Sequence, residues 1–127
     1  MKTSLLFLCF ILLSMPCQAQ TNDKKVIFEL KTKCMELARD YCTYEGLSFK
    51  GSLYDAKTNN CYVLSQRRDT LYFLRYISNV HTGQILAKSC YYYKAGFTNY
   101  GQIGEANVPY EKAEDYITRF VKRLTQE

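Results

Sequence analysis

The sequence lacks tryptophan altogether and contains a single histidine, two prolines and six glycines among its 127 residues. So few glycines and prolines exclude a collagen-like repeat, and a hydrophobic content of 47% excludes a disordered chain. A chain of this length forms one domain at most, which excludes a large multidomain enzyme. The motifs HExxH, GxSxG, GxGxxG, CxxC and the Walker loop are also absent, so no local motif indicates an enzyme class.

The one long apolar run lies within the first twenty residues and has the pattern of a secretory signal peptide. A lysine near the start is followed by an apolar stretch from Leu5 to Met15, and small residues occupy positions −3 and −1 of a cleavage site after Ala19. The stretch is shorter than the roughly 20 residues that a membrane-spanning helix requires. We therefore expect residues 1–19 to be a signal peptide and residues 20–127 to be a single exported domain, periplasmic or extracellular, without a membrane span.

Two segments of the mature chain have apolar residues spaced three and four apart, which is typical of amphipathic helices. The first runs from Asp23 to Cys42, with Asn22 or Asp23 as its N-cap and Gly46 soon after its end, and the second follows Pro109. Between the two helices, alternation with a period of two predicts strands at 47–53, 61–66, 71–80 and 84–93, and residues 94–108 form a loop. The pattern predicts an α+β fold with two layers: an N-terminal helix, a four-stranded antiparallel meander and a C-terminal helix.

Four cysteines remain in the predicted mature chain: Cys34, Cys42, Cys61 and Cys90. An even number in an exported chain favours two disulfides, because exported proteins meet oxidising surroundings. A zinc site is the alternative, but zinc sites use closely spaced pairs, and the spacings here are 8, 19 and 29 residues. We expect neither a metal nor another cofactor.

The helical pattern also suggests how the cysteines pair. Cys34 lies on the apolar face of the first helix and so faces the sheet, where Cys61 opens the second predicted strand. Cys42 lies eight residues later, about 80° further around the helix, and must reach a different strand. We predict the disulfides Cys34–Cys61 and Cys42–Cys90.

Charged and titratable residues form no obvious site. His81 is the single histidine and lies in a predicted turn without a neighbouring nucleophile or carboxylate, as a solvated surface residue would. Basic residues outnumber acidic ones by 17 to 12, but they occur as pairs rather than as a stripe. We therefore expect no nucleic-acid partner.

The tyrosines, twelve in number, are the most unusual feature. Tyr91, Tyr92 and Tyr93 end the fourth predicted strand, and Phe97 and Tyr100 follow closely. In a strand, Tyr91 and Tyr93 point to one face and Tyr92 to the other, so one of the two faces carries an aromatic side chain away from the helices. Tyrosine is enriched at protein interfaces, although its high strand propensity also suits it to the rim of a small core. We expect these five residues to bind another protein.

One segment resembles a pattern found in small uncharacterised exported bacterial proteins, in which Ser-x-Tyr-(Asn/Asp) is followed by Asn-x-Cys and an apolar strand. The segment reads Ser-Leu-Tyr-Asp at 52–55 and Asn-Asn-Cys at 59–61, with Leu53 where the pattern has histidine. These proteins also carry a cysteine on the first helix, matched by Cys34, and a closing amphipathic helix. The resemblance covers about a quarter of the chain. It implies an exported α+β domain and no particular activity, and it leaves Cys42 and Cys90 to form their own bridge.

Together these observations predict a small exported, non-catalytic binding protein of the inhibitor or immunity type. A small secreted hydrolase that uses His81 with a distant acidic residue is one alternative, and a structural envelope component is another. A carboxylate or hydroxyl within hydrogen-bonding reach of His81 inside a cleft would favour the hydrolase. The sequence leaves the oligomeric state and the identity of the partner open.

Overall fold

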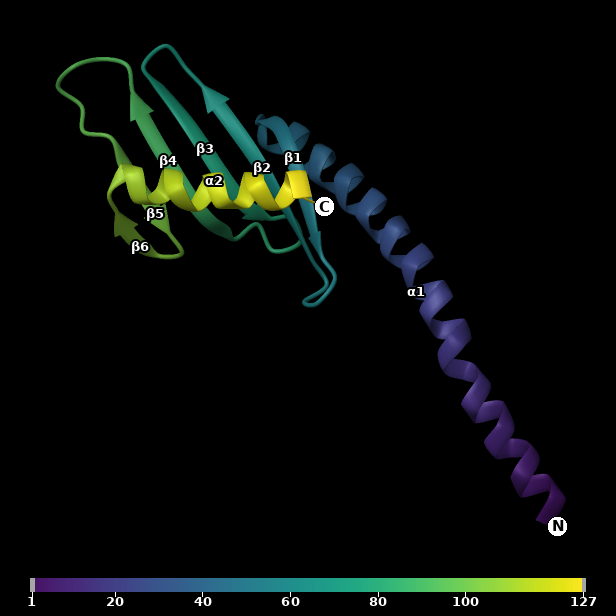
Figure 1. Cartoon of the computed structure of the whole chain (residues 1–127). Helices are drawn as coiled ribbons and strands as arrows, with labels where there is room; N and C mark the ends of the chain where they lie inside the picture. Colours follow the sequence, from purple (N-terminus) through teal and green to yellow (C-terminus); the bar gives the residue numbers. More distant parts are fainter. Residues whose placement is uncertain (1, 127) are drawn as a thin grey trace. The chain divides into compact units, whose positions relative to one another are not determined.

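A computed structural model describes the backbone of residues 2–126 and the side chains of residues 23–126. The chain divides into two units, Met1–Thr32 and Lys33–Glu127. The first unit contains the N-terminal part of helix α1, which spans Lys2–Glu45 (Figure 1). The side chains of the predicted signal peptide lie outside the described residues, and its cleavage stays a prediction. Within the described part of the chain, no helix combines the length and the apolar character that a membrane crossing needs.

Helix α1 differs from the expected helix at its start but not at its end. The backbone is helical before Asp23, so the predicted N-cap at Asn22 or Asp23 is wrong. The helix ends where Gly46 adopts a positive φ of 69°. There the Leu47 N–H donates a hydrogen bond to the Cys42 carbonyl at 2.8 Å, which is the pattern of a glycine-terminated helix.

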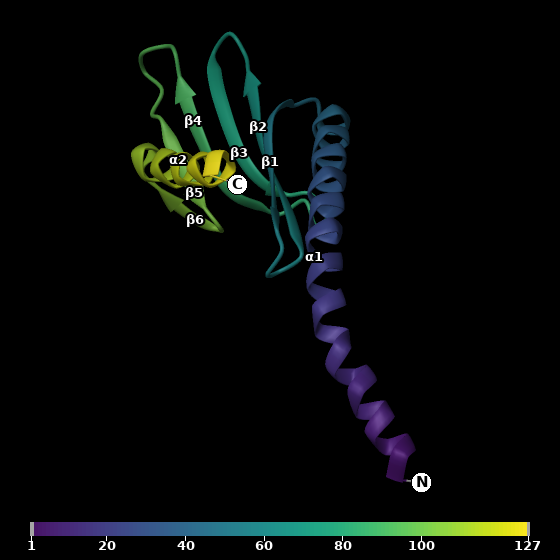
Figure 2. The same ribbon diagram turned by 45° about the vertical axis from the view of Figure 1, so that its right-hand side comes forward.

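The second unit is built on one antiparallel sheet with the strand order β1-β2-β3-β4-β5-β6 (Figures 1 and 2). The predicted meander topology is confirmed, with six strands rather than four. The strands are β1 (Ser48–Asp55), β2 (Asn60–Arg68), β3 (Tyr72–Asn79), β4 (Ile85–Tyr92), β5 (Tyr100–Ile103) and β6 (Ala106–Val108). Helix α2 (Tyr110–Gln126) follows, as the spacing of its apolar residues predicts.

Strands β5 and β6 lie within the segment that was expected to be a loop. They are only four and three residues long, and Gly104, with a φ of 58°, forms the turn between them. Gly101 lies in β5 because helix α2 passes very close: a Cβ atom at this position would come within 2.5 Å of the Ala113 Cβ. A glycine that suggests a loop therefore marks a close contact between strand and helix.

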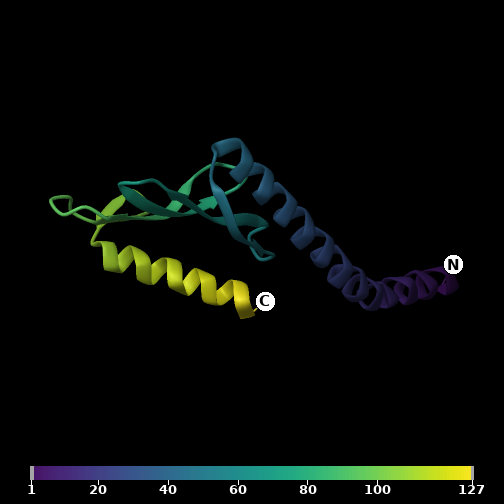
Figure 3. The ribbon, with the colours of Figure 1, turned by 90° about the horizontal axis from the view of Figure 1, so that it is seen from above.

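Helix α2 and segment 33–45 of α1 lie on opposite faces of the sheet, so the expected two-layer arrangement is wrong. Val63 and Leu64 are neighbours in β2 and point to opposite faces. Leu64 belongs to a core cluster with Ile117 of α2, whereas Val63 packs with Ala38 and Cys42 of α1. Figure 3 shows α2 lying along one face of the sheet. Helix α1 covers part of the other face through its segment 33–45.

A polar contact also joins α2 to the sheet. Arg75 of β3 donates a hydrogen bond from Nη1 to Glu114 Oε2 at 2.6 Å, and the two side chains are 18% and 23% exposed. The buried Ser89 hydroxyl of β4 donates to the other carboxylate oxygen. One carboxylate on α2 thereby satisfies donors on two neighbouring strands.

The predicted disulfide between Cys34 and Cys61 is confirmed, with a Cα–Cα distance of 5.5 Å. It joins helix α1 to the beginning of β2. The predicted bridge between Cys42 and Cys90 is not present, and both residues are buried free thiols. Cys42 packs on Val63 of β2, whereas Cys90 lies in β4, two strands away. Two strand spacings exceed about 9 Å, which is beyond the Cα–Cα distance that a disulfide can span.

Candidate functional site

Segment 33–45 of α1 covers only part of one sheet face. Among residues 33–126, no other helix lies on that face. Helix α1 packs there against Val63 in β2, while α2 lies on the opposite face (Figure 3). Strands β3, β4 and β5 present a row of large side chains on this uncovered area. We call this surface the tyrosine face, and it comprises Tyr72, Tyr76, Lys88, Tyr92, Phe97 and Tyr100.

Tyr92 lies at the centre of the aromatic cluster. Its ring stacks on Phe97 with a centroid distance of 5.1 Å and an interplanar angle of 22°. The rings of Tyr72 and Tyr100 each lie 6.4 Å from it, on the two strands that flank β4. The strand register explains this grouping, because Tyr72 pairs directly with Tyr92 and Tyr100 pairs with Cys90. Aromatic pairs at these distances attract one another, so the cluster holds its own shape.

The loop after β4 is held against this cluster. The Tyr92 backbone N–H donates a hydrogen bond to Asn99 Oδ1 at 2.8 Å, which closes the loop at its base. Phe97 stacks on Tyr92 and is still 49% exposed. The loop therefore presents an ordered aromatic side chain to solvent.

Lys88 adds a positive charge to the middle of the face. Lys88 in β4 pairs with Tyr76 in β3. The ammonium Nζ lies 5.7 Å from the centroid of the Tyr76 ring and 5.4 Å from that of Tyr100. Cation–π attraction to two rings keeps this half-buried charge over the sheet.

The structure divides the five aromatic residues that were expected to form one binding surface. Tyr92, Phe97 and Tyr100 lie together on the tyrosine face. Tyr91 and Tyr93 point to the α2 face, where their rings lie 5.8 Å apart and Tyr91 is 5.9 Å from the ring of Tyr110. The alternation along β4 follows the expected strand geometry, and it separates the five residues into two groups.

Tyr72, Tyr76 and Lys88 were not identified from the sequence. Alternation along β3 shows that Tyr72 and Tyr76 share a face, but it does not show which residues of β4 lie beside them. That register contains an irregularity between Ile77 and Ser78, which simple counting from the turn misses.

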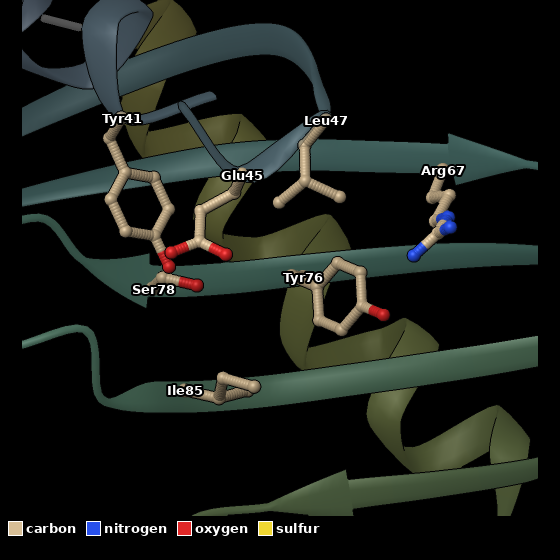
Figure 4. Close-up of a pocket in the computed structure, with 7 residues that line it drawn as sticks. All are labelled: Tyr41, Glu45, Leu47, Arg67, Tyr76, Ser78 and Ile85. Carbon is tan, nitrogen blue, oxygen red and sulfur yellow. The ribbon is translucent and has the colours of Figure 1, made fainter. Parts of the chain in front are cut away.

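A shallow depression adjoins the tyrosine face at its α1 side (Figure 4). Its volume is about 180 Å³, and its lining residues are Tyr41, Glu45, Leu47, Arg67, Tyr76, Ser78 and Ile85. Pockets that enclose small organic molecules usually measure about 300 Å³ or more. The depression is therefore suited to a single side chain rather than to a cofactor.

The predicted turn places His81 at the surface between β3 and β4. Its backbone N–H donates to Asn79 Oδ1 at 2.9 Å, and the residue is exposed. Its imidazole makes no hydrogen bond with any side chain or backbone group of residues 23–126. Among the same residues, no group of three or more potential metal ligands was found.

Three hydroxyls of the tyrosine face have pKa values above the ordinary value of about 10. Burial raises the pKa of Tyr76, against the opposing effect of Lys88 and Arg67. Hydrogen bonding to the Cys90 side chain, followed by burial, raises the pKa of Tyr92. Burial, followed by interaction with Cys90, raises the pKa of Tyr100. These hydroxyls therefore keep their protons at neutral pH and can donate hydrogen bonds.

These raised pKa values predict a difference between the folded and the unfolded protein. Tyr76, Tyr92 and Tyr100 should ionise at a higher pH in the folded protein than in the unfolded chain. Because their pKa values are raised in the folded state, the stability they contribute is present below pH 10 and falls as the pH rises through the raised values. Absorbance at 295 nm, recorded against pH in buffer and in guanidinium chloride, measures tyrosinate formation in the two states. The same titration curve in both solvents would contradict the burial of these hydroxyls.

No protein-family model matches the chain, and comparisons with curated proteins and with solved structures gave no match either.

Proposed function

We propose that this protein is a small exported binding module that contacts another protein through the tyrosine face and performs no catalysis itself. The observation that supports the proposal most strongly is the aromatic surface of β3, β4 and β5, where Tyr92 lies against the rings of Tyr72, Phe97 and Tyr100. Beside this cluster, Lys88 lies over the rings of Tyr76 and Tyr100. Tyrosine and phenylalanine are enriched at interfaces because they bring large contact area with few rotatable bonds.

Two further features support binding of a macromolecule. The aromatic residues lie on strands and on a tethered loop, so little ordering is needed when a partner binds. The adjoining depression is too small for most metabolites but accepts one protruding side chain.

The Cys34–Cys61 disulfide suits an oxidising location, in agreement with the expected export.

Truncation of Phe97 tests the proposal. Interface aromatics commonly contribute 2 kcal/mol or more, so Phe97→Ala should weaken capture of the partner about 30-fold. The tagged protein and its variants are incubated with the exported proteins of its own source, and the bound protein is titrated and identified. Phe97 is exposed, so its replacement should change the thermal unfolding midpoint little.

Tyr116→Ala is the matched control, because Tyr116 is an exposed aromatic residue on α2, on the other side of the sheet. It should capture the same partner as the parent protein. Equal capture by parent, Phe97→Ala and Tyr116→Ala would refute the proposed surface.

A further inference from the structure

The tyrosine face and the adjoining depression carry two positive charges that form no ion pair within residues 23–126. Lys88 lies over Tyr76 and Tyr100. Arg67 points to the same face as Val63, because the two residues are four positions apart in β2. Neither cation forms a salt bridge with any carboxylate of residues 23–126. Because a partly buried charge is costly unless it is paired, an anionic group of a binding partner would be favoured beside Lys88.

Tyr76 lies between these two cations. Figure 4 shows Arg67 and Tyr76 on the same side of the sheet, and Lys88 pairs with Tyr76 on the neighbouring strand. Both positive charges oppose the rise in the pKa of Tyr76 that burial causes, as expected when they lie close to its hydroxyl. One hydroxyl and two cations therefore converge on one part of the surface.

A negative charge at the edge limits what can bind there. Glu45, at the end of α1, lines the same depression as Arg67 and Tyr76 (Figure 4). A stiff polyanion such as duplex nucleic acid would extend past the cations and meet this carboxylate. A flexible acidic segment can place one carboxylate between Arg67 and Lys88 and turn away from Glu45, and the surrounding rings offer apolar contact to the residues beside that carboxylate.

Building on the proposed function, we propose that the partner is recognised through an acidic polypeptide segment, with one Asp or Glu carboxylate seated between Arg67 and Lys88. The carboxylate accepts hydrogen bonds from the guanidinium and ammonium groups and from the Tyr76 hydroxyl. Its neighbours in the partner contact the rings of Tyr92 and Tyr100. The capture experiment described above identifies the partner itself.

A defined probe tests the charge preference. An octaglutamate peptide is titrated into the ¹⁵N-labelled protein, and an octalysine peptide serves as the opposite charge. We expect saturable shifts of the amide signals of residues 67, 76 and 88 with octaglutamate, and none with octalysine. An exposed charge pair contributes up to about 1 kcal/mol, so Arg67→Gln and Lys88→Gln should each weaken binding up to about fivefold, and both together up to about 25-fold.

Arg68→Gln provides the matched control. Arg68 is the next residue on β2, carries the same charge and points to the other face, over the ring of Phe73. It should bind octaglutamate as the parent protein does, within twofold, and Lys88→Arg should retain binding because it keeps the charge. Thermal unfolding of each variant confirms that the fold is intact.

Three results would overturn the proposal: no shifts at these residues, an equal loss in Arg68→Gln, or tighter binding of polyphosphate or of phosphatidylglycerol vesicles than of octaglutamate at the same residues. The partner capture experiment distinguishes binding through the tyrosine face from recognition of an acidic segment. If Phe97→Ala loses the partner while the Arg67→Gln/Lys88→Gln variant keeps it, the tyrosine face is the binding surface but the partner is not recognised through an acidic segment. If neither variant loses the partner, both proposals fail.

Discussion

Replacing Cys34 and Cys61 together with alanine should lower the free energy of unfolding by about 3.5 kcal/mol. The disulfide closes a loop with a sequence separation of 27 residues, and it joins helix α1 to β2. Without it, the unfolded chain gains conformational freedom, and α1 is held on the sheet by non-covalent contacts such as the packing of Ala38 and Cys42. Urea unfolding followed by circular dichroism measures the change.

Reductant provides the control for this prediction. Dithiothreitol should lower the unfolding midpoint of the parent protein to that of the variant, and it should leave the variant unchanged, because Cys42 and Cys90 are free thiols. A further loss of stability when the reduced variant is compared with the unreduced one would show that a second disulfide exists. Equal stability of the parent protein and the variant would contradict the role given to the first.

Replacing Glu114 with glutamine should cost about 2–3 kcal/mol of stability. The Glu114 carboxylate accepts hydrogen bonds from Arg75 and from the buried Ser89 hydroxyl. Arg75 Nε is buried and has no partner within residues 23–126, so the guanidinium depends on Glu114 for its charge balance. Removing one member of a largely buried pair leaves the other charge without compensation.

The adjacent residue gives a closely matched comparison. Asp115 also forms an ion pair on α2, with Arg119 at 2.9 Å, but those side chains are 60% and 77% exposed. Asp115→Asn should therefore cost less than about 0.5 kcal/mol, since exposed pairs contribute little. Chemical unfolding of both variants decides the question. A loss in Glu114→Gln no larger than that in Asp115→Asn would show that the Arg75 contact contributes nothing beyond a surface pair.

The elements with regular spacing could be predicted from the sequence, and their arrangement in layers could not. Helix α2 follows Pro109 as its apolar periodicity indicates, and Gly46 ends α1. The period of two in β2 hides the fact that Val63 and Leu64 are both buried, each beneath a different helix. Two consecutive apolar residues in a strand are consistent with cover on both faces, and the sequence contains this pair.

The candidate site was predicted only in part for a related reason. Alternation shows which residues of one strand share a face, so it separates Tyr92 from Tyr91 and Tyr93. The grouping of Tyr92 with Tyr72 and Tyr100 depends on the register of three strands and on the short strand β5. Local spacing shows neither the register nor β5, because the β3–β4 ladder contains an irregularity and β5 is only four residues long.

Site-specific photo-cross-linking shows whether the tyrosine face is a binding surface. Benzoylphenylalanine is placed at position 97 in one protein and at position 116 in another, and each is irradiated with the exported proteins of its own source. Phe97 and Tyr116 are both exposed aromatic residues, so the substitution is conservative at each site. We expect one discrete cross-linked protein from position 97 and none from position 116. The same products from both positions, or a discrete product from position 116 alone, would show that the tyrosine face is not the binding surface.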